Sequence, residues 1–250
     1  MSQPEPLNPE PLNTQRCSPP PKRETLRVMF GRIAPGYDRF NTLLSFGQHH
    51  RWRRFAARQC RFPPGGLALD VGVGTADFAL EVIGKTGRAI GVDPCEPMMR
   101  AGVEKLCRRG ARERVLLVAG EAEHLPVAGD RFDCATTGFT LRNVTDIDQT
   151  FAEMARAVRP GGRVVALEIA KPRIPGFAPL FFLYFYRLSP LLARLFGGDP
   201  EAYQYLPHSL KEFRSREELA DSMRRAGLIE VRWYDLSGGS VAVHVGTKPG

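Results

Sequence analysis

The sequence has 250 residues, of which 43% are hydrophobic and 25% are charged, with a formal net charge of +8. This is ordinary globular composition with room for one sizeable core, so a second full domain is not required. The five cysteines form no C-x-x-C pair, which argues against a disulfide framework or a zinc site and indicates reduced thiols in a cytoplasmic protein without a bound metal.

The N-terminal quarter of the chain is proline-rich at first and then basic. Residues 1–24 contain seven prolines and almost no large apolar residue, which predicts a disordered tail without a secretory signal. Residues 25–60 predict a helical lid that ends in an amphipathic helix, with Trp52 and Phe55 among arginines. Residues 1–60 hold ten Lys or Arg and four acids, a charge that suits an anionic membrane surface, nucleic acid or a solvated basic face.

Short apolar runs that alternate with helical patterns predict a parallel sheet covered by helices on both faces. The expected strands are 67–71, 89–92, 115–118, 132–136 and 164–169. Residues 173–212 form an apolar insertion that charges and prolines interrupt too often for a membrane span, and 215–227 predict a helix. Two glycines join the last strand-like runs, 230–236 and 240–245, as in a hairpin. The predicted fold is α/β and Rossmann-like, a mostly parallel seven-stranded sheet with a C-terminal antiparallel hairpin.

The segment Leu67–Asp77 runs from an apolar strand through a glycine turn into a helix, the context of a nucleotide-binding loop. Dinucleotide-binding proteins and methyltransferases share this pattern. Asp70 and Asp77 flank the turn, and carboxylates there repel a pyrophosphate but attract the ammonium and sulfonium groups of S-adenosylmethionine. The charges therefore favour S-adenosylmethionine over NAD.

Acidic residues also follow the next two predicted strands. Asp93 ends the second strand, where a carboxylate can accept both ribose hydroxyls of a nucleoside, and Glu121 follows the third, where it can receive an adenine amino group. A solvated strand end is the alternative for each acid alone. Three acids at successive strand ends favour one shared ligand site, because open α/β sheets bind ligands there.

With these features the sequence resembles the class I methyltransferase fold and, more closely, the ubiquinone/menaquinone biosynthesis C-methyltransferase family, from about Phe30 to the C-terminus. The most specific segments are Tyr-Asp-x-x-Asn from Tyr37 and Leu-Arg-Asn-Val from Leu141. Other similar stretches are 30–36, 44–47, 52–53, 160–163, 167–168, 203–209 and 238–244.

The resemblance implies S-adenosylmethionine as the cofactor. Together with the loop and strand-end arguments, it gives a set of cofactor-binding residues: Asp70, Gly72, Gly74, Thr75, Asp93, Glu121, Ala122 and Gly138. Three residues depart from the family pattern. Ala76 replaces a third loop glycine, Glu121 replaces Asp or Asn, and Gly138 replaces a frequent cofactor-contacting serine. The first two are interpreted as tolerated variants, whereas Gly138 calls that one side-chain contact into question.

The implied reaction is methyl transfer to a ring carbon of a prenylated quinol, with demethylmenaquinol favoured over a ubiquinone-precursor benzoquinol or a phytyl-naphthoquinol. The candidate catalytic residues are Arg142, Asn143, Tyr37, Tyr203 and His208. Arg142 would stabilise a quinolate oxygen directly or through a water, or else pair with Asp146 or Asp148. Tyr37 would contact the ring from a lid that includes Asp38 and Asn41, whose alternative role is helix capping. His244 is interpreted as a sheet residue.

The expected partners follow from the acceptor. The apolar insertion would receive the prenyl tail, unless it is an ordinary core helix pair, and the basic N-terminal helix would touch anionic headgroups. This predicts a cytoplasmic protein with peripheral contact at the inner face of the plasma membrane, a homodimer as one option, and no nucleic-acid partner. An RNA methyltransferase and a non-catalytic S-adenosylmethionine-binding protein are the alternatives from other classes.

Overall fold

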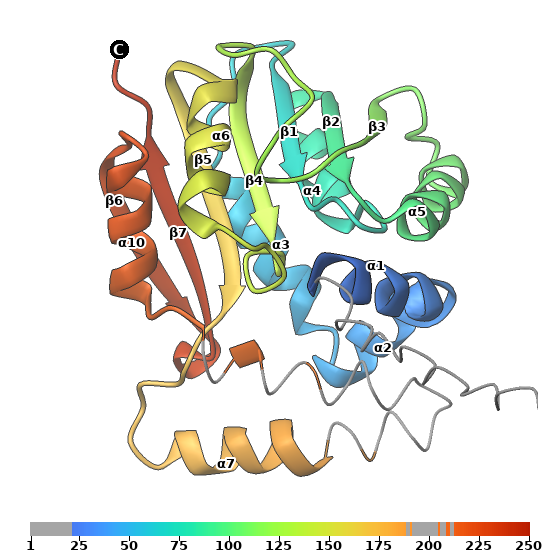
Figure 1. Cartoon of the computed structure of the whole chain (residues 1–250), viewed down its shortest axis with the longest axis vertical. Helices are drawn as coiled ribbons and strands as arrows, with labels where there is room; N and C mark the ends of the chain where they lie inside the picture. The colour runs from blue at the N-terminus through green and yellow to red at the C-terminus, as the bar shows by residue number, and fades with distance from the viewer. Residues whose placement is uncertain (1–21, 189–190, 192–204, 206–208, 211–212) are drawn as a thin grey trace, which may run out of the picture.

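The computed structural model describes residues 22–188, 191, 205, 209–210 and 213–250, and its centre is a seven-stranded sheet (Figure 1). The strands are β1 (Leu67–Val71), β2 (Arg88–Asp93), β3 (Val115–Ala119), β4 (Phe132–Gly138), β5 (Val158–Ile169), β6 (Ile229–Leu236) and β7 (Val241–Thr247). Their order is β3-β2-β1-β4-β5-β7-β6, with β7 antiparallel to both neighbours and the other pairs parallel. This confirms the predicted fold class.

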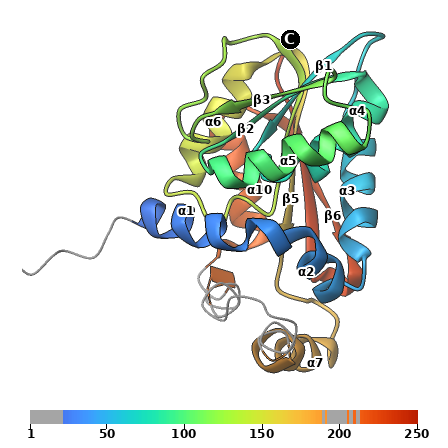
Figure 2. The same ribbon diagram turned by 90° about the vertical axis from the view of Figure 1, so that its right-hand side faces the viewer.

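Helices cover both faces of the sheet (Figure 2). They are α3 (Gln48–Gln59), α4 (Asp77–Thr86), α5 (Glu96–Arg108), α6 (Ile147–Ala157) and α10 (Arg216–Arg225). One core lies under α3, α4 and α5 and includes Ala56, Phe78 and Leu106. The other lies under α6 and α10 and includes Phe151 and Met223. Two cores form because successive strand residues point to opposite faces of the sheet.

Local signals explain where several elements begin. Asp146 caps α6 and accepts a hydrogen bond from the Gln149 backbone N–H at 3.0 Å, and Ser215 begins α10 with a capping box that includes Glu218. β5 begins six residues earlier than predicted, because Val158 pairs with Phe132 before the register shifts.

The N-terminal helices lie across the carboxyl ends of the parallel strands (Figures 1 and 2). They are α1 (Lys22–Ile33), a 3-10 turn (Ala34–Gly36) and α2 (Tyr37–Leu44). α1 begins three residues before the boundary predicted for the lid, and residues 1–21 of the predicted tail lie outside the described residues. α3 differs from the expected lid because it packs beside α4. The sequence predicted that the arginines of this helix contact lipid headgroups. Arg53 is only 5% exposed, so it cannot make that contact.

The apolar insertion contains α7 (Phe177–Leu183), which continues into a π-helical turn (Tyr184–Leu188). Of the insertion predicted at 173–212, residues 189–190, 192–204, 206–208 and 211–212 lie outside the described part of the chain. Within the described ranges, no helix is both long and apolar enough to cross a membrane.

Ala76 stands just before α4 in the left-handed region, with φ +67°. A side chain there costs about 1–2 kcal/mol, whereas glycine has no such penalty. Glycine also loses more entropy on folding, and the fully buried Ala76 methyl group would be lost, so these effects nearly cancel and we expect Ala76→Gly to change the free energy of unfolding by less than about 0.5 kcal/mol. Urea denaturation measures this. Ala101→Gly, inside α5, is the control and should destabilise by about 1 kcal/mol; equal losses in both variants would contradict the prediction.

Candidate functional site

Two open pockets lie side by side between the N-terminal helices and the carboxyl ends of the parallel strands. The first, of about 1000 Å³, is lined by the glycine turn, Asp93, Glu121 and α1. The second, of about 1050 Å³, is lined by α2, α3, the loop after β4 and α7. Four residues line both pockets: Phe30, Tyr37, Phe139 and Asn143. The two pockets therefore adjoin each other at these four residues.

The glycine turn after β1 forms the floor of the first pocket. Gly72 has φ +71°, and a Cβ there would lie 2.2 Å from the Thr140 Oγ1, so only glycine fits. The Gly74 backbone N–H donates to an Asp93 carboxylate oxygen at 2.8 Å, and the Cys95 N–H donates to the other at 2.8 Å. These two hydrogen bonds fix the glycine turn and the Asp93 carboxylate relative to each other. A nucleotide-binding loop needs such a fixed turn next to its acidic residue.

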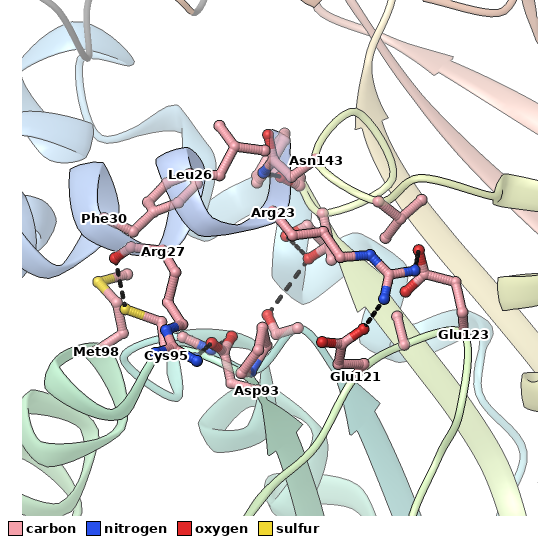
Figure 3. A pocket seen from close by; sticks show the side chains of 18 of the residues that line it. Arg23, Leu26, Arg27, Phe30, Asp93, Cys95, Met98, Glu121, Glu123 and Asn143 are labelled. Atoms are coloured by element: carbon pink, nitrogen blue, oxygen red, sulfur yellow. Dashed lines mark hydrogen bonds and ion pairs between the residues drawn. The ribbon is translucent and has the colours of Figure 1, made fainter. Parts of the chain in front are cut away.

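Carboxylates from two strand ends reach the first pocket (Figure 3). Asp93 ends β2 and is 8% exposed; burial raises its pKa, which its hydrogen bonds oppose. Glu121 follows β3 and lies at the rim together with Ala122. Each Asp93 oxygen has a lone pair left after its backbone bond, so this carboxylate can still accept ligand hydroxyls.

Arg23 lies at the same rim and is a functional candidate that the sequence argument missed. Its guanidinium pairs with both Glu121 and Glu123, and the Arg23–Glu123 separation is 3.0 Å. Glu123 is itself buried and accepts hydrogen bonds from the backbone of Thr145 and Asp146. Arg23 was assigned to the tail, and the signal that would have found it is the helical spacing from Arg23 through Leu26 to Phe30.

The other two acids of the loop do not present free negative charge to a ligand, which is a correction of the charge argument. Asp77 pairs with the Lys105 Nζ at 2.5 Å and lies 3.6 Å from Arg53, and these cations lower its pKa against the effect of burial. Asp70 is 1% exposed beneath the turn, lines neither pocket, and accepts a hydrogen bond from Thr136. The carboxylates that line the first pocket come instead from the β2 and β3 ends and from Glu24 of α1.

Thr75 was expected to contact the cofactor, but its hydroxyl is turned toward the protein. It donates to the Asp38 carboxylate at 2.7 Å and accepts from the Lys105 ammonium at 3.0 Å, and the residue is 3% exposed. Asp38 in turn pairs with Lys105 at 2.7 Å. Asp38 therefore anchors α2 to the glycine turn and to α5 and does not cap a helix.

Burial raises the pKa of Asp70 to about 7, against a lowering effect of the Thr136 hydrogen bond. The folded protein keeps this proton up to that pH, whereas the unfolded chain releases it near pH ~4, so stability falls as pH rises between them. From pH 5 to pH 8 we expect a loss of about 2 kcal/mol from this group, and Asp70→Asn should remove it. Urea denaturation at both pH values, with exposed Asp221→Asn as control, measures the effect. Parallel slopes in all three proteins would contradict the prediction.

Gly138, at the end of β4, lines the first pocket where the resemblance implied a serine. A Cβ at this position would lie 2.8 Å from the Phe78 ring. The missing side-chain contact thus has a packing reason, because Phe78 of α4 occupies the space.

Arg142 lines the second pocket, and its ion-pair partner is neither of the two acids considered from the sequence. Its Nε donates to the Glu168 carboxylate at 2.7 Å, and its Nη1 donates to the Ser209 hydroxyl at 3.0 Å. Arg142 and Glu168 are 7% and 1% exposed. The alternative of pairing with Asp146 or Asp148 is wrong, since Asp146 caps α6 and Asp148 pairs with other arginines.

Asn143 and Tyr37 stand at the junction of the two pockets. The Asn143 side-chain oxygen accepts a hydrogen bond from the Tyr205 hydroxyl at 3.1 Å. Burial raises the pKa of Tyr37, with the Arg53 charge and a hydrogen bond to Asn41 acting in the opposite direction. The Tyr37 hydroxyl is therefore neutral and available for hydrogen bonding at neutral pH.

Four histidines of the chain lie in different surroundings. His208, like Tyr203, lies outside the described residues. His244 is fully buried in β7 beside Trp233, and its Nε2 lies 3.0 Å from the Arg216 carbonyl oxygen, which confirms its interpretation as a sheet residue. Burial lowers the pKa of His244 to about 4. His49, His50 and Asp77 have potential metal-ligating atoms within 4.8 Å of one another.

That cluster is a poor metal site, because Lys105 and Arg53 both lie beside Asp77. The expected absence of a metal stays a prediction. The first pocket, in contrast, fits the expected cofactor. It offers carboxylate oxygens at two strand ends for hydroxyl, amino or cationic groups, and apolar side chains of Leu26 and Met98 for a base.

Comparison with known proteins agrees with this geometry. The model of the ubiE/COQ5 methyltransferase family matches residues 21–248. A demethylmenaquinone methyltransferase of Roseiflexus sp. (strain RS-1) is 47% identical over 96% of this chain and its own full length. A ubiquinone/menaquinone biosynthesis C-methyltransferase of Geotalea uraniireducens is 40% identical over 91% of this chain and 97% of its own. A solved S-adenosylmethionine-dependent methyltransferase of Thermotoga maritima has a similar fold, with TM-score 0.58, 24% identity, and coverage of 89% and 99%.

Proposed function

The chain belongs to the ubiE/COQ5 methyltransferase family, and we infer from this membership that it methylates a ring carbon of a prenylated quinol in menaquinone biosynthesis. The methyl donor is S-adenosylmethionine, and the reaction converts demethylmenaquinol to menaquinol. The protein is thus an S-adenosylmethionine-dependent C-methyltransferase. For this chain, we propose which residues perform each task, where the tail lies and how the protein contacts the membrane.

The observation that best supports methyl transfer is that the two pockets adjoin each other. Methyl transfer requires donor and acceptor to be held in line within one water-poor site. Phe30, Tyr37, Phe139 and Asn143 belong to the walls of both pockets, so a donor in the first can face an acceptor ring in the second. When bound, S-adenosylmethionine supplies an electrophilic methyl group on a sulfonium centre.

The first pocket supplies groups that would hold the cofactor. Asp93 would accept the ribose hydroxyls, because both its oxygens are already aimed by backbone N–H groups. Glu121 and Ala122 would receive the adenine, and the Gly72–Gly74 turn would let the amino-acid portion approach the backbone. Arg23 would close the rim through its pairs with the two glutamates there.

The second pocket supplies groups that would orient the quinol. Tyr37, as a neutral hydroxyl, and Asn143, fixed by Tyr205, would hydrogen-bond ring oxygens at the junction. Arg142 is held by Glu168 and would face the ring from the loop after β4. Tyr203 and His208 stay candidates on sequence grounds alone.

An apolar groove along α7 continues from the second pocket. Phe181 and Tyr184 line both, and the groove also includes Leu180, Leu183 and Leu188. A prenyl chain is flexible and purely apolar, so it gains from burial along such a groove. We place the prenyl tail of the acceptor in this groove, which is the role expected for the apolar insertion from the sequence.

Two leucines of this groove are largely exposed, Leu180 at 62% and Leu183 at 60%. Exposed apolar side chains along a tail groove suit contact with the membrane in which a prenylated quinol resides. We expect Leu180→Ser/Leu183→Ser to reduce co-sedimentation with phosphatidylglycerol vesicles at least about threefold, since each leucine contributes about 1–2 kcal/mol of burial. Leu116→Ser, exposed by 53% on β3, is the control. Unchanged binding of the double variant would contradict the membrane proposal.

The assignment is tested with the purified full chain, labelled S-adenosylmethionine and three reduced acceptors: a prenyl-naphthoquinol, a ubiquinone-precursor benzoquinol and a phytyl-naphthoquinol. We expect label in the organic phase with the first, and mass spectrometry should place one methyl on the ring. Transfer to tRNA instead would favour an RNA methyltransferase, and cofactor binding without any transfer would favour a non-catalytic protein. Sedimentation in the same buffer tests the homodimer.

A further inference from the structure

Two guanidinium groups line the second pocket, and among its described lining residues there is no carboxylate. Arg53 comes from α3 and Arg142 from the loop after β4, and both are more than nine-tenths buried. A buried cation is costly unless an anion or an acceptor atom compensates it. A pocket built this way therefore favours a ligand that carries negative charge.

The two arginines differ in how far the protein already neutralises them. Arg142 has its own buried carboxylate, Glu168, at 2.7 Å. Within the described part of the chain, Arg53 pairs with Asp77, at 3.6 Å, and Asp77 lies closer to Lys105, at 2.5 Å. Because Coulomb energy falls with distance and Asp77 is shared, more of the Arg53 charge is left to act on a ligand.

A neutral histidine orients Arg53. The Arg53 Nη1 donates to the His49 Nδ1, and arginine is only a donor, so Nδ1 is unprotonated and the ring hydrogen is on Nε2. Nε2 then donates to the Thr42 hydroxyl at 3.2 Å, which donates to the Asp38 carbonyl oxygen at 2.8 Å. Burial, followed by the Arg53 charge, lowers the pKa of His49 to about 3, so this chain of donors holds Arg53 without cancelling its charge.

Arg53 also lies next to the junction of the two pockets. Its Cζ is 5.3 Å from the centre of the Phe139 ring, and Phe139 lines both pockets. Phe139 has φ +60°, an unfavourable backbone conformation for an aromatic residue that is typical of functional sites. Trp52 packs edge-on against the same ring. The guanidinium is thus placed where an acceptor ring would meet the methyl group.

We propose that Arg53 contacts a ring oxygen of the acceptor and is the main cation stabilising its anionic form. The proposal rests on the proposed function and moves this role from Arg142, whose main task is then to position the ring. Methyl transfer forms a bond from a ring carbon to the methyl carbon, breaks the S–CH₃ bond with its electron pair left on sulfur, and releases the hydrogen of that ring carbon as a proton. An ionised ring oxygen supplies the electron density for the new bond, so its stabilisation lowers the barrier.

The test uses 1-naphthol, whose own absorbance reports whether its hydroxyl is ionised, bound to the full chain in the presence of S-adenosylhomocysteine. The wild type should shift this ionisation to lower pH by about one unit, since a nearby cation favours the charged form. Arg53→Gln should abolish the shift, and Arg53→Lys should keep part of it. Arg54→Gln is the matched control, because Arg54 is an exposed neighbour on the same helix.

The absorbance of the naphthol itself is the readout because several protein groups around Arg53 can also ionise, and a pH profile of activity would mix their titrations with that of the ligand. These groups are Tyr37, His49, His50, Asp70, Asp77, Lys105 and Arg142. Single-turnover methylation should also slow about 100-fold in Arg53→Gln at pH 7 and recover partly at higher pH, with unchanged donor binding as proof that the variant is folded.

A wild-type-like naphthol titration in Arg53→Gln, a loss of shift only in Arg142→Gln, or no naphthol binding to the wild type would overturn the proposal. A rate loss of equal size at every pH would also do so, because it would indicate a purely structural role. Absence of quinol methylation by the wild type would instead refute the proposed function, and the naphthol readout would remain independent of it.

Discussion

Replacing Arg142 with leucine is expected to lower the free energy of unfolding by about 3–5 kcal/mol and to slow turnover at least about 100-fold. The stability loss follows because Glu168 is 1% exposed and would be left as a buried charge without its ion-pair partner. Donor affinity should stay within about threefold of the wild type, since Arg142 does not line the first pocket and loses no contact there. Urea denaturation, single-turnover kinetics and titration calorimetry measure the three quantities.

A double variant separates the stabilising role of this pair from its role in the reaction. Arg142→Leu/Glu168→Leu removes both charges, and such replacements of a buried pair are close to neutral, so most of the lost stability should return. Turnover should not return, because the ring loses its positioning group. Arg173→Leu breaks an exposed pair with Glu217 and should cost less than about 1 kcal/mol. A double variant that recovers activity would show that Arg142 matters only for folding.

Much of the fold was predictable because buried parallel strands and glycine turns leave local signals. β1 has the predicted bounds, and the other strands agree within a few residues except at the start of β5. The hairpin also matches, with a 3-10 turn at Ser237–Gly239 between its strands. These elements are specified by neighbours in sequence, so a pattern of apolar residues and breakers is sufficient.

The charge pairing of the site was not predictable, because it depends on contacts between distant segments. Asp77 looked like a free carboxylate beside a cofactor, yet Lys105 from α5 and Arg53 from α3 both reach it. Arg142 had two acids nearby in sequence, but its partner Glu168 comes from β5, 26 residues away. Proximity in sequence says little about which of several acids a buried arginine meets once the strands are packed.

The same reasoning explains two residues whose importance only the three-dimensional structure reveals. Arg23 was counted with the proline-rich tail, but α1 carries it over the first pocket. Arg53 looks like one of the surface charges of a basic helix, but its helical spacing with the buried His49, Ala56 and Ala57 places it on the side that faces the core and the second pocket. A charged residue on the apolar side of a helix is a signal worth reading, because burying it requires a partner or a ligand.

Gly72→Ala is expected to weaken binding of S-adenosylmethionine at least about 100-fold and to destabilise the fold by about 2–5 kcal/mol. Two effects combine at this position. The residue has φ +71°, where a side chain costs about 1–2 kcal/mol, and the new Cβ would lie 2.2 Å from the Thr140 Oγ1. Overpacking of that kind typically costs about 1–3 kcal/mol, and relief requires the turn or the Thr140 loop to move. Both line the first pocket, so any movement that relieves the clash also displaces groups that hold the cofactor.

Gly87→Ala provides the matched comparison for this variant. Gly87 ends α4 with φ +92°, and a Cβ there has no neighbour within 4 Å, so the substitution imposes backbone strain without a clash. It should cost about 1–2 kcal/mol and leave donor affinity unchanged. Adding Thr140→Gly to Gly72→Ala should restore the stability lost to the clash. The stability lost to backbone strain should not return. If Gly72→Ala bound the donor as tightly as Gly87→Ala does, the glycine turn would not be part of the cofactor site, because its close packing could then be disturbed without consequence for the ligand.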